Sequence, residues 1–226
     1  MPRKRDPDAR RNLLAAARAA FSDVGVESAR IEDISRAAGL SKGAFYLHFD
    51  SKQAAFQEIV TDFFAVMRDV AQQKHEACVD LRATLGSPTA EDWRFHTPRL
   101  QAWAANDHAH TVRALQAMWR HRDVLRCVLV EGAGPRHALL DQFVDLTREM
   151  LSTQLATAID AGGLRDDLDR DLVSELIIGM YLQLGRRMTR HATRPDFDVW
   201  ARTVDALMSE GLATRANDQP VRNVAP

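Results

Sequence analysis

The sequence is short of cysteine and of long apolar runs. Only Cys78 and Cys127 occur in 226 residues, too few for a disulfide framework or a cysteine-rich zinc site. We therefore expect two reduced thiols. No stretch approaches the ~20 apolar residues of a membrane-spanning helix, and the charged start, Met1 to Asp6, lacks the apolar core of a signal peptide. These absences predict a cytoplasmic protein that makes no membrane contact.

An excess of one charge is also missing. The chain has 30 Lys and Arg against 31 Asp and Glu, a net charge of −1, which argues against coating of nucleic acid over the whole surface. The distribution is uneven, however. Residues 1–52 hold ten basic and seven acidic residues, and the remainder holds 20 and 24. This asymmetry favours phosphate binding at the N-terminal end alone, although a surface of randomly uneven charge would look the same.

Prolines are few, eight in all, and they leave long stretches with helical periodicity and almost no strand-like alternation. We expect an all-α fold of about nine or ten helices in three parts. These are a helix-turn-helix DNA-binding domain at 1–52, a helical ligand-binding and dimerisation domain at 53–213, and a disordered tail at 214–226. The expected helices are one ended by Gly25, then Ile31–Ala38, Ser41 to about Phe49, Ser51 to about 80, 90–105, 108–121, 122–131, 136–161, 169–191 and 196–213, with Asp169 and Asp196 as N-caps.

The clearest local pattern, at about residues 30–49, is a pair of short helices around one glycine. Gly39 can adopt the left-handed conformation that ends a helix, and Ser41 can cap the next one. On a helical wheel Phe45 and Phe49 share one side, which would anchor the second helix to the core. The opposite side carries Gly43, Tyr46 and Leu47, with Lys42 at its flank, and is where a recognition helix meets the major groove.

The stretch Ile31–Phe49, followed by Ser51 and Lys52, resembles the signature of the tetracycline-repressor (TetR/AcrR) family. The match covers residues ~8–60 and depends on an Ala-Ala-Gly turn, Ser-Lys-Gly, and Tyr-x-His-Phe. It implies a homodimeric, ligand-responsive transcription factor, usually a repressor, that binds double-stranded operator DNA. By the same resemblance, the DNA-contacting residues would be Ser41, Lys42, Gly43, Ala44, Tyr46, Leu47, His48 and Lys52. Arg30 joins this set as the expected replacement for a phosphate contact of the family.

One position departs from that family pattern. Family members commonly carry Thr where this chain has Ala29, and the threonine caps the second helix and touches a phosphate. We expect Ser28 to replace the cap and Arg30 to replace the phosphate contact. Two other interpretations of the motif are a plain helical hairpin and, from Gly39 to Gly43, the G-x-S-x-G nucleophile elbow. The elbow needs a strand before its serine, and here a helix precedes it.

Aromatic residues, methionines and histidines concentrate in the middle of the chain. Such side chains can form an apolar cavity with a few polar groups, which suits a small-molecule effector. They can equally be the core of a helical bundle, and only the resemblance favours a pocket. The candidate ligand-binding residues are Phe64, Met67, Trp93, His96, Trp103, His110, Met118, Trp119, Phe143, Met150 and Tyr181.

Eight histidines raise the question of a metal site. His108 and His110 are two residues apart, so on a helix they point in different directions. No H-E-x-x-H motif, cysteine cluster or paired carboxylate accompanies them. We expect no metal, no cofactor and no catalytic residues, and the alternative of a helical hydrolase or metal-dependent lyase is disfavoured.

The last two expected helices each carry an apolar face at helical spacing, and Gly179 and Gly185 in the first of them could allow close helix approach. Such a face can pack within the chain or against a partner, and the family dimerises through its last two long helices. The resemblance therefore implies a four-helix seam with a palindromic operator. A transcriptional activator and a ligand-independent regulator of the same fold remain alternatives. The candidate interface residues are Leu176, Ile177, Met180, Leu184, Trp200, Val204, Leu207 and Met208.

Overall fold

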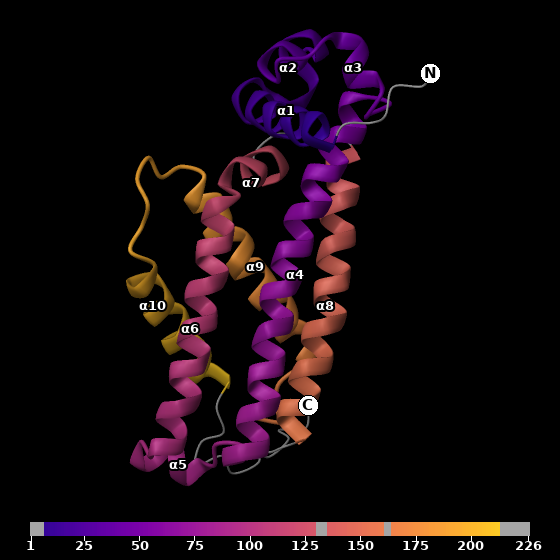
Figure 1. Ribbon diagram of the computed structural model, residues 1–226. Helices are drawn as coiled ribbons and strands as arrows, with labels where there is room; N and C mark the ends of the chain where they lie inside the picture. Colours follow the sequence, from indigo (N-terminus) through magenta and orange to yellow (C-terminus); the bar gives the residue numbers. More distant parts are fainter. Residues whose placement is uncertain (1–6, 130–134, 161–163, 213–226) are drawn as a thin grey trace, which may run out of the picture. The chain divides into compact units, whose positions relative to one another are not determined.

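The computed structural model describes residues 7–129, 135–160 and 164–212, and it folds them into ten α-helices (Figure 1). The expected all-α fold is confirmed, whereas the expected tail at 214–226 lies outside the described residues. The helices are α1 (Pro7–Ser28), α2 (Ile31–Ala37), α3 (Lys42–Tyr46), α4 (Lys52–Leu85), α5 (Ala90–Phe95), α6 (Pro98–Arg120), α7 (Arg122–Leu129), α8 (Pro135–Asp160), α9 (Arg170–Met188) and α10 (Phe197–Leu212).

The apolar face of α1 builds the core of the N-terminal helices. Leu13, Ala17 and Phe21 follow at intervals of four residues and are buried almost completely, as the spacing of one helical face requires. The ring of Phe21 meets that of Phe56 of α4 edge to face, 5.8 Å between centroids. The first helix was expected to end at Gly25, and this glycine is indeed non-helical (φ 78°, ψ 160°). A short helical segment follows the kink and reaches Ser28.

Helices α5 and α6 differ from the two helices expected at 90–105 and 108–121. A capping box of Thr89 and Asp92 starts α5, and His96 ends it in the left-handed conformation (φ 49°). Pro98 then begins α6, because its fixed φ suits the first helical position. From there α6 runs unbroken to Arg120, since no glycine or proline interrupts it. The expected break near residue 107 was therefore wrong.

The caps expected for the last two helices are confirmed. Asp169 accepts hydrogen bonds from the backbone N–H groups of Asp171 (3.0 Å) and Leu172 (3.1 Å). Asp196 does the same for Asp198 and Val199, at 3.0 and 3.2 Å. Each carboxylate pairs N–H groups that have no partner inside the helix, and its charge is favourable at that end.

The chain divides into two compact units that share several helices. The first holds residues 1–66, 118–143 and 182–192, and the second holds 67–117, 144–181 and 193–226. The predicted boundary at residue 52 is a division by function, which packing does not test, and it stays a prediction.

In the first unit an ion pair joins α1 to α7. Arg18 pairs with Asp123 and also donates to the backbone carbonyl of Arg120 at 2.9 Å. Burial works to raise the pKa of Asp123, but the guanidinium of Arg18 outweighs it and the pKa is lowered. The two helices are thereby held together by a charged contact as well as by apolar packing.

Glycines 179 and 185 of α9 were both expected to permit close helix approach. Within the described chain only Gly185 does so, in the first unit. A Cβ there would lie 3.1 Å from Leu129 and 3.2 Å from Met118, so the glycine lets α9 pack tightly. A Cβ at Gly179 would meet no described atom within 4 Å, so no described helix of this chain approaches closely there, and approach by a partner's helix stays a prediction.

Candidate nucleic-acid interface

The turn between α2 and α3 has the geometry that its sequence predicts. Gly39 is left-handed, with φ 72°, and the following N–H, that of Leu40, bonds back to the carbonyl of Ser35 at 2.8 Å. Ser41 then caps α3, because its hydroxyl accepts a hydrogen bond from the N–H of Ala44 at 3.2 Å. The left-handed glycine and the serine cap together fix where α2 stops and where α3 starts.

The inner side of α3 anchors it to the rest of the unit. Phe45 is fully buried and Phe49 is 4% exposed, with their ring centroids 5.4 Å apart. The guanidinium of Arg10, on α1, lies 5.0 Å from the centre of the Phe49 ring and pairs with Glu58 of α4. Both phenylalanines are thus the anchors that the wheel predicts.

The outer side of α3 is open. Tyr46 and Leu47 are exposed by 49% and 51%, and Ser41, Lys42 and Gly43 are exposed as well. A Cβ at Gly43 would meet only the hydroxyl of Ser41, at 3.8 Å, and the φ of Gly43 is not positive. Nothing within the chain therefore requires glycine at this position.

The two lysines of the predicted set have partners within the chain. Lys42 pairs with Glu32 of α2, and this contact raises the pKa of Lys42 and lowers that of Glu32. Lys52 donates to the backbone carbonyls of Glu27 and Ala29. It therefore ties the start of α4 to the junction of α1 and α2, a role that its place in the motif did not reveal.

The expected cap of α2 was wrong. Arg30 occupies the N-cap position and makes no side-chain cap hydrogen bond, while Ser28 is the last residue of α1. Ala29 is 5% exposed. The chain therefore buries a small apolar side chain at the position where family members commonly carry threonine. Arg30 itself is exposed.

Two members of the predicted set are less accessible than the others. Ala44 and His48 are half-buried, and Nδ1 of His48 is buried without a hydrogen-bond partner in the described part of the chain. Ser41, Lys42, Gly43, Tyr46 and Leu47 therefore form the accessible surface of α3, which we call the outer face.

The candidate effector residues are distributed over both compact units. Phe64, Met118, Trp119 and Phe143 belong to the first unit, where Phe64 and Phe143 stack with centroids 4.1 Å apart. The other seven belong to the second unit. There Trp103 donates to the carbonyl of Gly86 at 3.0 Å, whereas His96 is exposed at the end of α5. These seven are Met67, Trp93, His96, Trp103, His110, Met150 and Tyr181.

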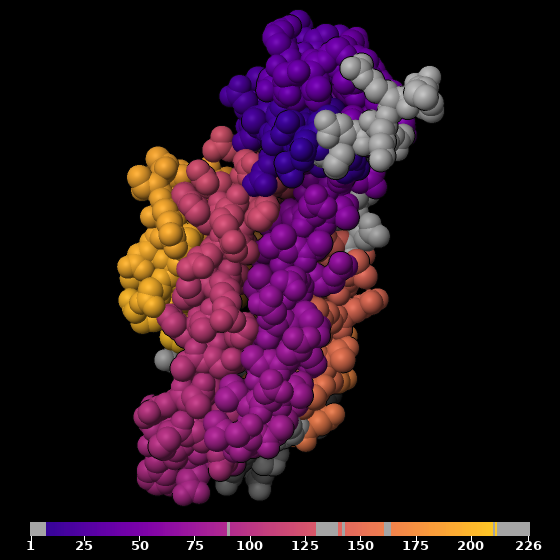
Figure 2. Space-filling view, viewed as in Figure 1, coloured from indigo at the N-terminus to yellow at the C-terminus, as the bar shows by residue number. Residues whose placement is uncertain are grey.

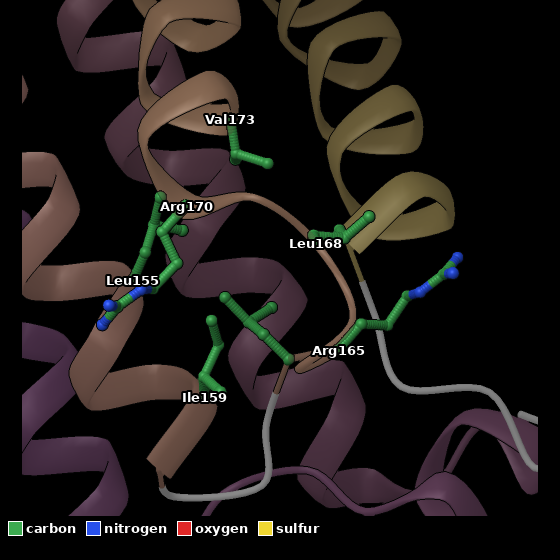
Figure 3. Close-up of a pocket in the computed structure, with 7 residues that line it drawn as sticks. Leu155, Ile159, Arg165, Leu168, Arg170 and Val173 are labelled. Carbon is green, nitrogen blue, oxygen red and sulfur yellow. The ribbon is translucent and has the colours of Figure 1, made fainter. Parts of the chain in front are cut away.

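A small cleft with a volume of about 10 Å³ lies in the second unit, and none of the candidates lines it. Figure 3 shows Leu155 and Ile159 of α8 beside Val173 of α9, with Leu168 on the connecting segment. Its volume is below the ~300–1,000 Å³ of ordinary ligand pockets, so we do not assign it to the effector.

A polar cluster in the second unit was missed by the sequence reasoning, apart from His110 and Tyr181. Lys74 of α4 and Asp107 of α6 form an ion pair, Nζ to Oδ1, of 3.0 Å. Thr111 lies one turn after Asp107 on the same helix. The spacing of Asp107, His110 and Thr111, three and four residues, places them on one helical face and could have drawn attention to them.

The candidate interface residues differ in accessibility. Leu176 and Leu207 are exposed by 64% and 67%, and the nearby Leu172 and Val199 by 54% and 46%. Val204 is 5% exposed, so it packs within the chain and is unavailable to a partner. The remaining candidates, Ile177, Met180, Leu184, Trp200 and Met208, are half-buried.

Within residues 7–129, 135–160 and 164–212, no group of three or more His, Cys, Asp or Glu side chains could hold a metal ion. No helix in this part of the chain is long and apolar enough to cross a membrane.

The comparisons with known proteins point to one class. Residues 13–59 match the family described as "Bacterial regulatory proteins, tetR family". The chain is 26% identical to the HTH-type transcriptional repressor KstR2 of Rhodococcus jostii over 208 residues, 92% of this chain and 93% of that protein. It is 27% identical over 177 residues to the HTH-type transcriptional repressor AcnR of Corynebacterium diphtheriae, 74% of this chain and 90% of that protein.

The fold is similar to that of SmeT, the repressor of the Stenotrophomonas maltophilia multidrug efflux pump SmeDEF. The TM-score is 0.66 at 17% identity, and the match covers 97% of this chain and 98% of SmeT. A structure of SmeT in complex with triclosan gives a TM-score of 0.68 at 16% identity, covering 96% and 98% of the two chains.

A left-handed glycine turn, a serine-capped second helix and an open outer face define a helix-turn-helix DNA-binding protein. Residues 13–59 accordingly carry the DNA-binding domain of the tetR family of bacterial regulatory proteins. The chain is a DNA-binding transcriptional regulator similar to repressors of this kind.

Proposed function

We propose that this chain is a homodimeric repressor that a small, largely apolar ligand releases from a palindromic operator. The outer face of α3 carries the proposal. Its Tyr46 and Leu47 are half exposed, and Gly43 has no structural need for glycine within the chain. Close approach of a DNA backbone or base edge explains both observations, because a major groove admits a helix only when its outer side chains fit.

DNA contact follows from the same face. The N–H groups at the Ser41 end of α3 suit a phosphate oxygen, and Lys42 can exchange Glu32 for a phosphate. Tyr46, His48 and Lys52 are near enough in the chain to add phosphate contacts, which position the protein without reading sequence. With Gly43 and Leu47 where a bidentate base contact would need Arg or Gln, thymine methyls and DNA shape carry much of the specificity.

Dimerisation is supported by the exposed leucines of α9 and α10. Leu172, Leu176 and Leu207 are each more than half exposed, and large apolar side chains grouped on two helices mark an interaction surface. A two-fold dimer presents two copies of α3 to a DNA site with matching symmetry.

Repression and a small effector are supported by the relatives. KstR2 and AcnR are named repressors, and SmeT, a repressor of the same fold, has been solved with triclosan. An activator or a ligand-independent regulator of the same fold would bind DNA through the same face. A promoter–reporter assay separates these, because deletion of a repressor raises expression and deletion of an activator lowers it.

The test of DNA binding is footprinting on the region upstream of the protein's own gene. We expect protection of a palindrome, with affinity that falls as salt rises. Tyr46→Ala should weaken binding at least tenfold, which corresponds to about 1.4 kcal/mol and lies within the ~1–3 kcal/mol of a good contact. Phe95→Ala removes an aromatic side chain that is 63% exposed on α5 and is the matched control, with no expected effect. Equal affinity of both variants would contradict the proposal.

A further inference from the structure

Three helices bring polar side chains together inside the second unit. Lys74 lies on α4, Asp107, His110 and Thr111 share a face of α6, and Tyr181 lies on α9. Figures 1 and 2 show α4 and α6 running side by side, and the 3.0 Å ion pair between Lys74 and Asp107 joins them. His110 and Thr111 are each only 4% exposed, and buried polar side chains are normally hydrogen-bonded, so their surroundings need a chemical reason.

The hydrogen bonds of the cluster leave specific groups free. Thr111 donates its hydroxyl proton to Oδ1 of Asp205 at 2.7 Å, and its hydroxyl is also hydrogen-bonded to Tyr181. The phenol oxygen of Tyr181 both donates and accepts hydrogen bonds, so it keeps acceptor capacity. Lys74 has three N–H donors, of which Asp107 takes one. The cluster presents both unused donors and an unused acceptor.

The side chains of Lys74 and Asp107 keep accessible surface although many protein atoms surround them. The side chains of Lys74 and Asp107 are 43% and 44% exposed, yet burial is the strongest single influence on the pKa of Lys74. Burial acts to lower this pKa, and Asp107 outweighs it and raises the value. His110 is only 4% exposed, and its Nδ1 is buried with no hydrogen-bond partner among the described residues. A buried nitrogen without a partner is rare in folded proteins.

We propose that Lys74, His110 and Tyr181 bind the polar head of the effector, and that this head is a neutral oxygen-bearing group, a hydroxyl or a carbonyl. The inference rests on the proposed function, because it names the chemistry of the ligand that the regulator responds to.

The charge balance of the cluster selects a neutral head. Lys74 is paired with Asp107, and Asp205 is paired with His108. His110 is neutral at pH 7, since burial, then the charges of Arg113 and Lys74, lower its pKa; burial likewise keeps Tyr181 protonated by raising its pKa. A carboxylate would face Asp107 and leave the site with a net negative charge, and an ammonium would face Lys74. A hydroxyl or carbonyl meets the free donors without adding a charge that must be buried.

The positions around the cluster predict an apolar body for the same ligand. Met67, Val70 and Ala71 precede Lys74 by seven, four and three residues and therefore share its face of α4. Ile177 and Ile178 bear the same relation to Tyr181 on α9. A molecule with one polar end and an apolar remainder matches this pattern.

Matched probes test the head group directly. Two series, straight-chain and phenylalkyl, each end in an alcohol, a methyl ketone, a carboxylate or an ammonium, and calorimetric titration gives their dissociation constants for the full-length protein. We expect the alcohols and ketones to bind at least tenfold more tightly than the carboxylates and ammoniums. Tighter binding of either charged class, or no binding by any probe, would overturn the proposal.

Three variants assign the contacts. Lys74→Met should weaken alcohols and ketones alike, by about five- to tenfold. Tyr181→Phe should weaken alcohols more than ketones, because only an alcohol has a proton to donate to the phenol oxygen. Arg99→Met removes a cation that is 41% exposed and paired with Asp92, as Lys74 is with Asp107, and it should change neither class. Unchanged affinities in Lys74→Met and Tyr181→Phe would contradict the assignment.

Operator binding is measured separately on the same proteins without probe. If the unmodified chain does not bind an operator, the proposed function itself is refuted. Normal operator binding with the wrong head-group preference would refute only the effector class.

Discussion

Gly43 of α3 gives the sharpest separation of folding from DNA binding at the scale of one residue. A Cβ there would meet no atom of the chain closer than 3.8 Å, and alanine is the better helix former by ~0.8–1.0 kcal/mol. Gly43→Ala should therefore leave the free energy of unfolding unchanged or raise it by up to about 1 kcal/mol. The same change should weaken operator binding at least tenfold, since the added methyl group occupies the space of the DNA.

Urea unfolding and a gel-shift titration check these two effects on one preparation. A destabilised Gly43→Ala protein would show that the chain itself needs the glycine, and full affinity for DNA would show that the outer face of α3 lies away from the duplex.

At the scale of single residues, the sequence could predict the residues that anchor and cap α3, but it could not predict the hydrogen-bond partners of Lys52. Phe45, Phe49 and Ser41 take the positions that helical periodicity and capping rules assign to them. Ser28 does not cap α2, because α1 continues through it after the kink at Gly25. The carbonyl partners of Lys52 lie more than twenty residues away in the chain, and no local pattern encodes such contacts.

At the scale of elements, α9 carries a pair of glycines with opposite expectations. Gly185→Val should destabilise the fold by about 1–3 kcal/mol, because its side chain would overlap Leu129 and Met118. Gly179→Ala should stabilise by up to about 1 kcal/mol, since open space surrounds it. Thermal and urea unfolding of the two variants provides the comparison, and equal effects at the two positions would contradict the packing of α9 described above.

Helices α6 and α10 are joined by a histidine between two carboxylates. Nε2 and Nδ1 of His108 lie 2.8 Å from Asp198 and Asp205, and hydrogen bonds first to Asp198 and then to Asp205 raise the pKa of His108. The protonated form is thus favoured in the folded state. Its contribution to stability is complete below the unfolded pKa of about 6.5 and is lost as the pH rises through the higher folded value.

The free energy of unfolding should therefore fall more between about pH 6 and pH 9 in the unmodified protein than in His108→Asn. Denaturant titrations at several pH values measure the difference. Parallel pH profiles of the two proteins would show that His108 gains nothing from the carboxylates.

Helix boundaries illustrate what sequence patterns omit at this scale. The caps of α9 and α10 were predicted because a single aspartate signals each. The division of residues 90–120 was not, since the left-handed His96 and the capping box of Thr89 and Asp92 override an otherwise continuous helical pattern.

For the whole molecule, the exposed leucines of α9 and α10 predict self-association. Leu176→Glu together with Leu207→Glu places charges at positions that are 64% and 67% exposed and should convert a dimer to a monomer, because a desolvated like-charge contact is unfavourable. Val79→Glu, at a 46% exposed valine of α4, is the control and should remain dimeric. Analytical ultracentrifugation distinguishes these states, and a monomeric unmodified protein would contradict the proposed seam.

The fold class and the DNA-binding motif could be predicted for the whole chain because both are periodic, local properties. Of the proposed effector residues, His110 and Tyr181 were among the sequence candidates, but Lys74 was not, because its contact with Asp107 of another helix depends on tertiary packing. The candidates chosen for size and aromaticity divide between two units, and their role in ligand binding stays a prediction.

Selection of bound duplexes from a random DNA library tests the central claim most directly. The claim is that a dimer reads operator DNA through the outer face of α3. We predict enrichment of one palindromic sequence, with an affinity that falls steeply with salt and at least tenfold on Tyr46→Ala. Failure to enrich any sequence, or enrichment that Tyr46→Ala and Gly43→Ala leave unchanged, would contradict the claim.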